Sequence, residues 1–192
     1  MGCQSMTFSP AEAVNQILRK KSIETLKAHT KGDISLVDIE KKDDFIYAPM
    51  MVFILIHGKS FRITFKVHYY LTAARKLASS SINSSEEKVT NSLTDDFMKE
   101  YCNLIGGELK GSINKLGISV GTTFPFIISG FDEVLFSDHL SRSSVQDYWQ
   151  LKWAPDSITC TSVIEAHNPE IFQGIDSVPS TNKDKNGEIV FL

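Results

Sequence analysis

Apolar residues recur at two different spacings along the chain, and the change of spacing predicts where helices and strands lie. The segment Ser9-Pro10-Ala11-Glu12 has the residues of a helix start, with serine at the N-cap and glutamate where it can close a capping box. Apolar residues then repeat at helical spacing, at positions Ala13, Ile17, Leu18 and Leu26. The pattern therefore predicts a helix that ends near Gly32.

A shorter apolar period follows and predicts strands. Met50–His57 is a continuous apolar run of the kind found in buried strands, whereas Ser60–His68 alternates apolar and polar residues. The short turn Gly58-Lys59 between these two segments predicts a hairpin. Other strand-like segments are 35–41, 118–122, 126–129, 133–136, 148–154 and 158–165. The last two are expected to form a second hairpin with Pro155-Asp156 at its turn.

Two helices are expected in the middle of the chain. A short one is predicted over 69–78, and the segment 79–92, rich in Ser, Asn, Glu and Lys, is predicted to be a loop. A helix of more than 20 residues is predicted to begin with Thr94 as its N-cap and Asp95 and Asp96 in its first turn. It is predicted to stop before Gly117. Together the segments favour an α/β fold of the α+β type, a mostly antiparallel sheet with two long helices packed on one face.

The two sides of this long helix differ in chemistry. On a helical wheel of residues 97–116 the apolar side holds Phe97, Tyr101, Leu104, Ile105, Leu109 and Leu116, with Met98 and Ile113 at its edge. The opposite side holds Glu100, Asn103, Gly107, Gly111 and Asn114, with Lys110 beside them. Glu100 and Asn103 lie three residues apart, so their side chains are neighbours. Each glycine costs the helix roughly 0.5–1 kcal/mol relative to alanine, and its lack of a side chain lets another surface approach the backbone. We therefore interpret this side as a contact face.

Composition limits the classes of function. The 192 residues, 42% of them apolar, suit one domain over 8–172 with a tail over 1–7 and a polar extension over 173–192 that has an apolar end at 189–192. A net charge of −3 argues against nucleic-acid binding. The three cysteines are widely spaced and form no CxxC pair, which favours reduced thiols in the cytoplasm. The longest apolar run, eight residues, is too short to span a bilayer. The histidines have no metal-ligand spacing, and we expect no metal site.

Several other residues have a structural interpretation. Trp149 and Trp153 share one face of a strand and are expected to pack in the core. Cys102 is expected to be a buried thiol rather than a nucleophile, because nothing near it in the sequence would lower its pKa. The basic clusters Arg19-Lys20-Lys21 and Arg75-Lys76 are interpreted as solvated faces.

The segment from the long helix onward resembles the CheC/CheX/FliY family of chemotaxis phosphatases. The resemblance is carried by Glu100-Tyr101-Cys102-Asn103 with Gly106-Gly107, followed by Gly117 and Pro125. In that family a helix carries Glu-x-x-Asn and is followed by small residues and a strand that leads to a proline. The preceding order of one helix and three strands also fits a CheX-like arrangement, so the resemblance covers about residues 8–167.

The resemblance implies a phosphatase that acts on the aspartyl phosphate of a CheY-like receiver domain in two-component signalling. Asn103 would project its amide into the partner's active site and orient the attacking water, and Glu100 would pair with a lysine of the partner. Gly107, Lys110, Gly111 and Asn114 would belong to the docking face. This chain would bind no cofactor, because the partner would supply Mg²⁺ together with the phosphoaspartate. CheX-like members imply a homodimer joined through sheet edges.

Three alternatives stay open, one of which is a purely structural dimer in which this face of the long helix packs against its twin. The same face could serve a non-catalytic module that binds receivers or parts of the flagellar switch. Some family members also have two such helices, and Glu12 and Asn15 have the same spacing in the first helix of this chain. They are candidates for a second site, although Glu12 already fits the capping box and no glycines follow them.

Overall fold

A computed structural model of the chain describes residues 9–39, 48–129 and 144–175. Within these ranges the chain forms α-helices α1 (Pro10–His29), α2 (Leu71–Ser81) and α3 (Asn91–Lys115), with 3-10 turns η1 (Glu86–Lys88) and η3 (Pro169–Phe172). The strands are β1 (Ser35–Asp38), β2 (Met50–His57), β3 (Phe61–Tyr69), β4 (Gly121–Thr122), β5 (Phe126–Ser129), β6 (Val145–Trp153) and β7 (Asp156–Ala166). All seven strands belong to one sheet, and every pairing in it is antiparallel.

The sheet is built from two halves that exchange their edge strands. Its order is β1-β6-β7-β3-β2-β4, and β5 also pairs with β2. The hairpins β2–β3 and β6–β7 meet in the middle, where Phe65 lies opposite Ser162. The first half consists of α1, the edge strand β1 and the hairpin β2–β3. The second consists of α3, the edge strands β4 and β5 and the hairpin β6–β7, and the edge strands of each half pair with the hairpin of the other. The helices α1 and α3 therefore hold equivalent places in the topology.

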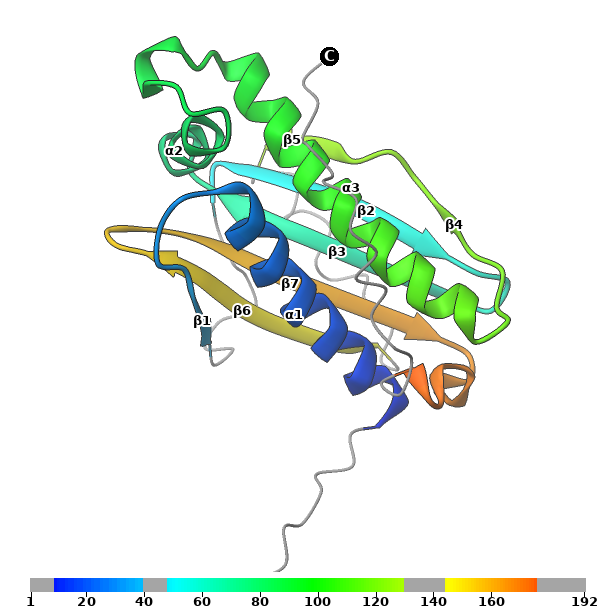
Figure 1. Cartoon of the computed structure of the whole chain (residues 1–192). Coiled ribbons are helices and arrows are strands. Elements are labelled where there is room, and N and C mark those ends of the chain that lie inside the picture. The colour runs from blue at the N-terminus through cyan, green and yellow to red at the C-terminus, as the bar shows by residue number, and fades with distance from the viewer. Residues whose placement is uncertain (1–8, 40–47, 130–143, 176–192) are drawn as a thin grey trace, which may run out of the picture.

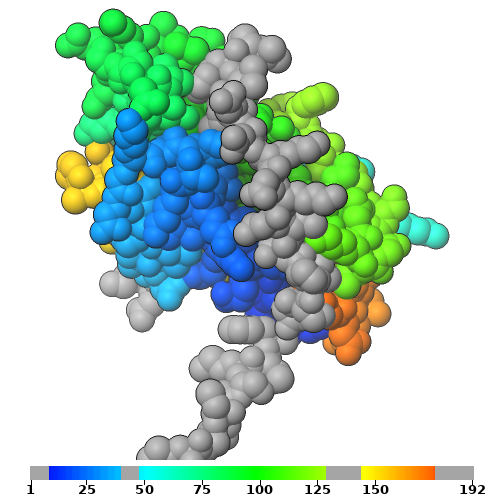
Figure 2. All heavy atoms as spheres, viewed as in Figure 1, coloured from blue at the N-terminus to red at the C-terminus, as the bar shows by residue number. Residues whose placement is uncertain are grey.

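The two long helices lie side by side on one face of the sheet and run in opposite directions (Figure 1). Two contacts between them fix their alignment: the Tyr101 hydroxyl donates to the Ser22 carbonyl at 3.0 Å, and Lys21 Nζ lies 3.4 Å from Glu108 Oε2. In the space-filling view α1 and α3 belong to the same face of the molecule (Figure 2). The expected fold class is confirmed.

The core fills the space between these helices and the sheet. Side chains with no exposed surface come from both layers: Val14, Leu18, Phe97, Ile105, Ile54, Phe65 and Trp149. Phe65 and Trp149 stack with their ring centroids 6.0 Å apart, which joins the two hairpins under the helices. The core continues to Ile175, which is 1% exposed and lies three residues beyond the expected domain boundary at 172.

The ends of the central helices differ from the prediction. The helix α2 ends at Ser81, and the expected loop over 79–92 contains its last residues, η1 and the start of α3. The N-cap of α3 is Thr90, whose hydroxyl accepts from the Leu93 amide at 3.2 Å. The expected cap, Thr94, lies inside the helix and is buried, and its hydroxyl donates to the Thr90 carbonyl at 3.0 Å. The local sequence offers two threonines as caps, and burial of Thr94 selects the earlier one.

The predicted hairpins are confirmed, as is the capping box at Ser9 and Glu12. The segment 118–122 forms a strand only at 121–122, and the segments 133–136 and 189–192 lie outside the described residues. Within the described ranges, none of the helices has the length and apolar character that a membrane crossing requires.

Candidate functional site

The outward side of α3 carries the residues singled out by the wheel. Asn103 is exposed and Glu100 is half-buried, and the Asn103 Nδ2 atom donates to Glu100 Oε2 at 3.2 Å. This hydrogen bond orients the amide of Asn103 with respect to the carboxylate. The amide oxygen of Asn103 takes no part in it and can accept a hydrogen bond from another group. The helix beneath is anchored on its opposite side by fully buried residues, Phe97, Met98, Cys102, Ile105, Leu109 and Ile113. The pair therefore stands on a rigid support and faces solvent.

The buried stripe is rotated slightly from the one expected. Met98 and Ile113, placed at its edge by the wheel, have no exposed surface, whereas Leu104 and Leu116 are only half-buried. The reason is that α3 packs on β2 as well as on α1, so that its buried side faces the sheet. This rotation does not change the outward position of Asn103.

Three glycines of α3 have two different roles. A Cβ atom added to Gly106 would lie 2.8 Å from Ile54 Cδ1, so Gly106 allows α3 to approach β2 closely. A Cβ atom added to Gly107 or Gly111 would meet nothing within 4 Å. The packing of this chain therefore requires glycine at 106 and does not require it at 107 or 111. The last two leave the helix backbone bare along the same side as Asn103.

Charged groups border this bare strip on the side of α1. Lys21 is 9% exposed and lies between Glu24 Oε2 at 3.2 Å and Glu108 Oε2 at 3.4 Å. The ammonium group of Lys21 thus ties α1 to α3 without using Glu100. Lys110 is half-buried and Asn114 is exposed at the far end of the strip.

His29, in the last turn of α1, is a titratable residue on which the charge of Glu100 acts. Burial lowers the pKa of His29 below its ordinary value of 6.5, and the negative charge of Glu100 opposes that lowering. Neither Lys21 nor His29 was predicted as part of this region, because nothing in the sequence shows which α1 residues lie beside α3.

The look-alike pair on α1 has a different environment. Glu12 is exposed, and its Oε2 atom accepts from the Ser9 amide at 2.8 Å. Hydrogen bonds from the Ser9 backbone and side chain lower the pKa of Glu12 below its usual range. Asn15 is 4% exposed, and its Oδ1 atom accepts from the Ser162 hydroxyl at 2.8 Å. Glu12 caps the helix and Asn15 joins the helix to the sheet, so this pair presents no amide to solvent.

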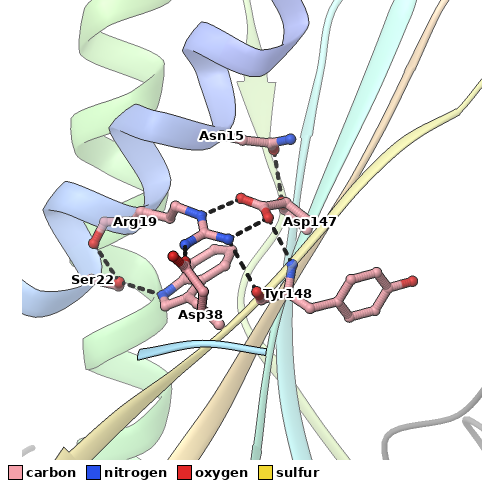
Figure 3. Close-up of polar contacts among 8 residues, drawn as sticks. Asn15, Arg19, Ser22, Asp38, Asp147 and Tyr148 are labelled. Carbon is pink, nitrogen blue, oxygen red and sulfur yellow. Dashed lines mark hydrogen bonds and ion pairs between the residues drawn. The ribbon is translucent and has the colours of Figure 1, made fainter. Parts of the chain in front are cut away.

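The basic cluster on α1 was predicted to be solvated, which holds for Lys20, whose side chain is 61% exposed, and is wrong for Arg19 and Lys21. The Arg19 side chain is 15% exposed and binds Asp147 through both carboxylate oxygens, at 2.5 and 2.6 Å (Figure 3). It also pairs with Asp38 on β1, donates to the Tyr148 carbonyl at 3.1 Å, and lies 5.2 Å from the centre of the Trp149 ring. Arg19 therefore holds the short strand β1 and the strand β6 to α1. The second cluster is also engaged, since Lys76 pairs with Asp156 at 2.8 Å and Arg75 donates to Asn91 at 2.7 Å.

The cysteine and one tryptophan agree with their structural interpretation. Cys102 and Cys160 are free thiols with no exposed surface, and burial raises the pKa of each thiol above its usual range. Cys102 lies beside Asn103 in the sequence, yet it points into the core and is unsuited to act as a nucleophile. Trp149 is fully buried and its indole donates to the Ser22 hydroxyl at 2.9 Å, whereas Trp153 is half-buried.

No protein-family model and no curated protein sequence matches the chain. Solved structures do match. CheX from Vibrio vulnificus superposes with a TM-score of 0.63 at 16% identity, over 81% of this chain and 100% of its own. CheX in the CheX–CheY–BeF3–Mg²⁺ complex from Borrelia burgdorferi gives a TM-score of 0.60 at 13% identity, over 79% of this chain and 96% of its own. FliY from Thermotoga maritima gives 0.56 at 12% identity, over 91% and 98%.

The described residues thus define a class of domain, one antiparallel sheet with two antiparallel long helices on one face and a bare polar strip on one of them. Within that class, the chain has the fold of the CheX, CheC-like and FliY chemotaxis proteins. The resemblance seen in the sequence is confirmed at the level of the fold. The functional roles of Glu100 and Asn103 stay a prediction.

Proposed function

We propose that this protein removes the phosphoryl group from the aspartyl phosphate of a CheY-like receiver domain. The observation that carries the proposal is the position of Asn103, exposed on α3 and oriented by Glu100 at 3.2 Å, beside a strip of helix that Gly107 and Gly111 leave bare. The fold adds support, because a CheX of the same fold was solved together with CheY, BeF3 and Mg²⁺.

An amide is suited to the proposed reaction. Hydrolysis of an aspartyl phosphate forms a bond between a water oxygen and phosphorus and breaks the bond between phosphorus and the aspartyl oxygen. The products are inorganic phosphate and the free carboxylate, and the proton of the water passes to solvent or phosphate. Such a step needs an oriented water and stabilised charge more than a protein nucleophile. The Asn103 amide can accept from and donate to that water without competing with it.

The remaining requirements would be divided between the two proteins. The receiver would supply the phosphoaspartate and the Mg²⁺ that offsets its charge. Glu100 would have two tasks, since it holds Asn103 and offers a carboxylate to a cation of the partner. Gly107 and Gly111 would let the receiver approach the backbone of α3, and Lys110 and Asn114 would contact it beyond the glycines.

Loss of phosphate from a phosphorylated receiver tests the proposal. CheY-like receivers are phosphorylated with a small phosphodonor and Mg²⁺, and the decay of phosphate is followed with and without this protein. Asn103→Ala is expected to reduce the rate at least about 100-fold, since misplacing a reacting group has effects of that order. Asn114→Ala is the comparison variant: it removes the same amide from the same side of α3 but at the far end of the strip, so it should affect docking and leave the rate at saturating receiver at the wild-type value. If Asn103→Ala is as active as an active wild type, the proposed mechanism is wrong.

A non-catalytic receiver-binding or flagellar-switch module is the second candidate. The observation behind it is that the exposed strip beside Asn103 would serve docking alone equally well. A binding module would use the same strip and would tolerate loss of the amide. The same assay separates the two functions, because a binding module would form a complex with the receiver while the lifetime of its phosphate stayed the same or lengthened.

A further inference from the structure

Phe124 holds an aromatic ring in solvent at the outer edge of the sheet. It lies between the edge strands β4 and β5 and is 88% exposed. The nearby Phe126 is 50% exposed, but its ring stacks on Phe53 with the ring centroids 5.6 Å apart. The fold therefore gives Phe126 a packing role that it does not give to Phe124. Because single exposed apolar side chains are common, the support and the position of Phe124 decide what it means.

The backbone that carries this ring is held firmly. Just before it, the Thr123 amide donates to the Leu55 carbonyl at 3.0 Å, and the Leu55 amide donates to the Thr123 hydroxyl at 3.1 Å. Just after it, Pro125 has a φ angle fixed by its own ring. Phe124 is therefore presented in one place, and a partner could bury its ring without the entropy cost of ordering a loose loop.

The pairing of this edge with β2 contains one extra residue. Phe126 pairs with Phe53, and Thr123 bonds to the residue two positions further along β2. Phe124 and the proline after it together lie opposite one residue of β2, which is Ile54. This is the two-against-one count of a β-bulge, which bends an edge strand and changes the direction of a side chain. The bulge accounts for the outward position of Phe124.

Ile54 also fixes the height of the bulge along α3. A Cβ atom added to Gly106 would lie 2.8 Å from Ile54 Cδ1, so the helix meets β2 at this point. Asn103 is three residues before Gly106, which is about 4.5 Å along the helix, and Gly107 is the next residue. Phe124, opposite Ile54, is therefore level with the proposed docking strip.

The strip and the bulge also border the same side of the molecule. Glu108 meets α1 through Lys21, and Gly106 meets β2. At 3.6 residues per turn, Asn103 lies about 140° around the helix from Glu108 and about 60° from Gly106, so it is turned away from α1. On that side α3 contacts β4 and β5 (Figure 1). Asn103 thus points over the edge that carries Phe124.

We propose that Phe124 is an anchor for the receiver, which docks on the strip of α3 and on the bulge between β4 and β5 at the same time. The inference rests on the proposed function, because it names a further contact of the same partner. An ordinary interface covers about 800 Å² on each protein, a patch roughly 30 Å across. A receiver centred on Asn103 would therefore reach the sheet edge. Aromatic side chains are enriched in such interfaces, and the ring would enter an apolar patch beside the receiver's phosphorylation site.

The first arm of the test measures the dissociation constant for a beryllofluoride-activated CheY-like receiver with Mg²⁺. Phe124→Ala should raise it about 30-fold, the change that corresponds to a loss of about 2 kcal/mol at an anchor residue. Phe124→Leu keeps an apolar side chain and should recover part of the loss. Tyr70→Ala is the matched control and should bind like the wild type. Tyr70 is 55% exposed before α2, and its side chain makes no capping hydrogen bond.

The second arm separates docking from catalysis. With a phosphorylated receiver as substrate, Phe124→Ala should raise KM and leave kcat at the wild-type value, because the ring would contribute to binding and not to the reacting water. Asn103→Ala should lower kcat instead. Phe124→Ala should also unfold at the wild-type temperature, since its ring is almost entirely in solvent. A lower unfolding temperature would assign the ring to the fold and overturn its role as an anchor.

The outcomes distinguish the two proposals. A wild-type dissociation constant in Phe124→Ala, or an equal loss in Tyr70→Ala, would overturn the anchor and leave the phosphatase proposal standing. Binding that depends on Phe124 without any loss of phosphate would support the anchor and contradict the phosphatase. A wild type that binds no activated receiver would overturn both. A dimer in sedimentation that becomes a monomer in Phe124→Ala, with unchanged receiver affinity, would assign the ring to a second copy of this chain.

Discussion

Two pairs of residues with the same spacing, Glu12/Asn15 on α1 and Glu100/Asn103 on α3, lie on helices that hold equivalent places in the sheet topology. Their surroundings are opposite. Asn15 is 4% exposed and bound to Ser162, whereas Asn103 is exposed and, among the residues that the structure describes, hydrogen-bonds to Glu100 of its own pair. Glu12 is used by the helix cap, whereas Glu100 remains at the surface of α3.

The difference shows what Glu-x-x-Asn spacing can and cannot establish. It places two side chains on one side of a helix, but the remaining apolar positions decide whether that side faces the sheet or solvent. In α1, buried Ala11, Val14 and Leu18 surround Asn15 at helical spacing, so Asn15 lies within the buried stripe. In α3, the buried residues lie opposite Asn103. Asn15 and Arg19 of α1 therefore connect the helix to the sheet, and Glu100 and Asn103 of α3 remain available to a partner.

The largest expected effect on stability comes from removing the charged side chain of Arg19, which joins α1 to β1 and β6. Arg19→Met keeps much of the aliphatic stem and leaves Asp147, which is 18% exposed, without its bidentate partner. We expect a loss of about 3 kcal/mol in the free energy of unfolding, the scale for breaking a largely buried ion pair. Urea unfolding measures it.

Lys20→Met is the matched control for Arg19→Met. Its ammonium group lies 3.8 Å from Glu24 on the solvated side of α1, and exposed pairs of this kind contribute about 0.2–1 kcal/mol. A similar loss in the two variants would show that Arg19 is no more integrated than its neighbour and would weaken the contrast between the helices.

The two asparagines give the next largest difference. Asn15→Ala removes the acceptor of the Ser162 hydroxyl, which has no exposed surface, and should cost about 1–3 kcal/mol. Asn103→Ala should change the free energy of unfolding by less than about 0.5 kcal/mol, because its partner Glu100 can turn to water. Thermal or urea unfolding of both variants checks this.

The rate of receiver dephosphorylation should show the reverse order. If the chain has the proposed phosphatase function, Asn15→Ala should act like the wild type per folded molecule, and Asn103→Ala should be at least about 100-fold slower. A stable Asn15→Ala variant that has lost activity would mean that α1 contributes to the site after all.

The sequence predicted those features that depend on local pattern. The hairpins β2–β3 and β6–β7 follow from apolar runs and short turns, and the outward position of Asn103 follows from the helical wheel. It also predicted Gly107 and Gly111 on the same side as Asn103, because helical periodicity determines which residues share a face.

Features that depend on distant segments could not be predicted in this way. The carboxylate that binds Arg19 lies 128 residues away on β6, so the sequence shows only a basic cluster. The cap of α3 could be Thr90 or Thr94 by residue type, and tertiary burial of Thr94 decides between them.

The smallest effect concerns the glycines that distinguish the strip on α3. Gly107→Ala should raise the free energy of unfolding by about 0.5–1 kcal/mol, since alanine is the better helix former and its Cβ would meet nothing within 4 Å. The added methyl group would nevertheless stand where the receiver is proposed to approach, so affinity for an activated receiver should fall.

Gly106→Ala provides the contrast to Gly107→Ala. Its Cβ would lie 2.8 Å from Ile54 Cδ1, and overpacking of this kind costs about 1–3 kcal/mol, more than the helix gains. A bare docking strip requires two results together. Gly107→Ala should be more stable than the wild type and bind the receiver more weakly, and Gly106→Ala should be less stable than the wild type. If Gly107→Ala is more stable and still binds and dephosphorylates the receiver like the wild type, then no partner approaches α3 at this point. The contrast between the two helices would then concern only which of them is buried.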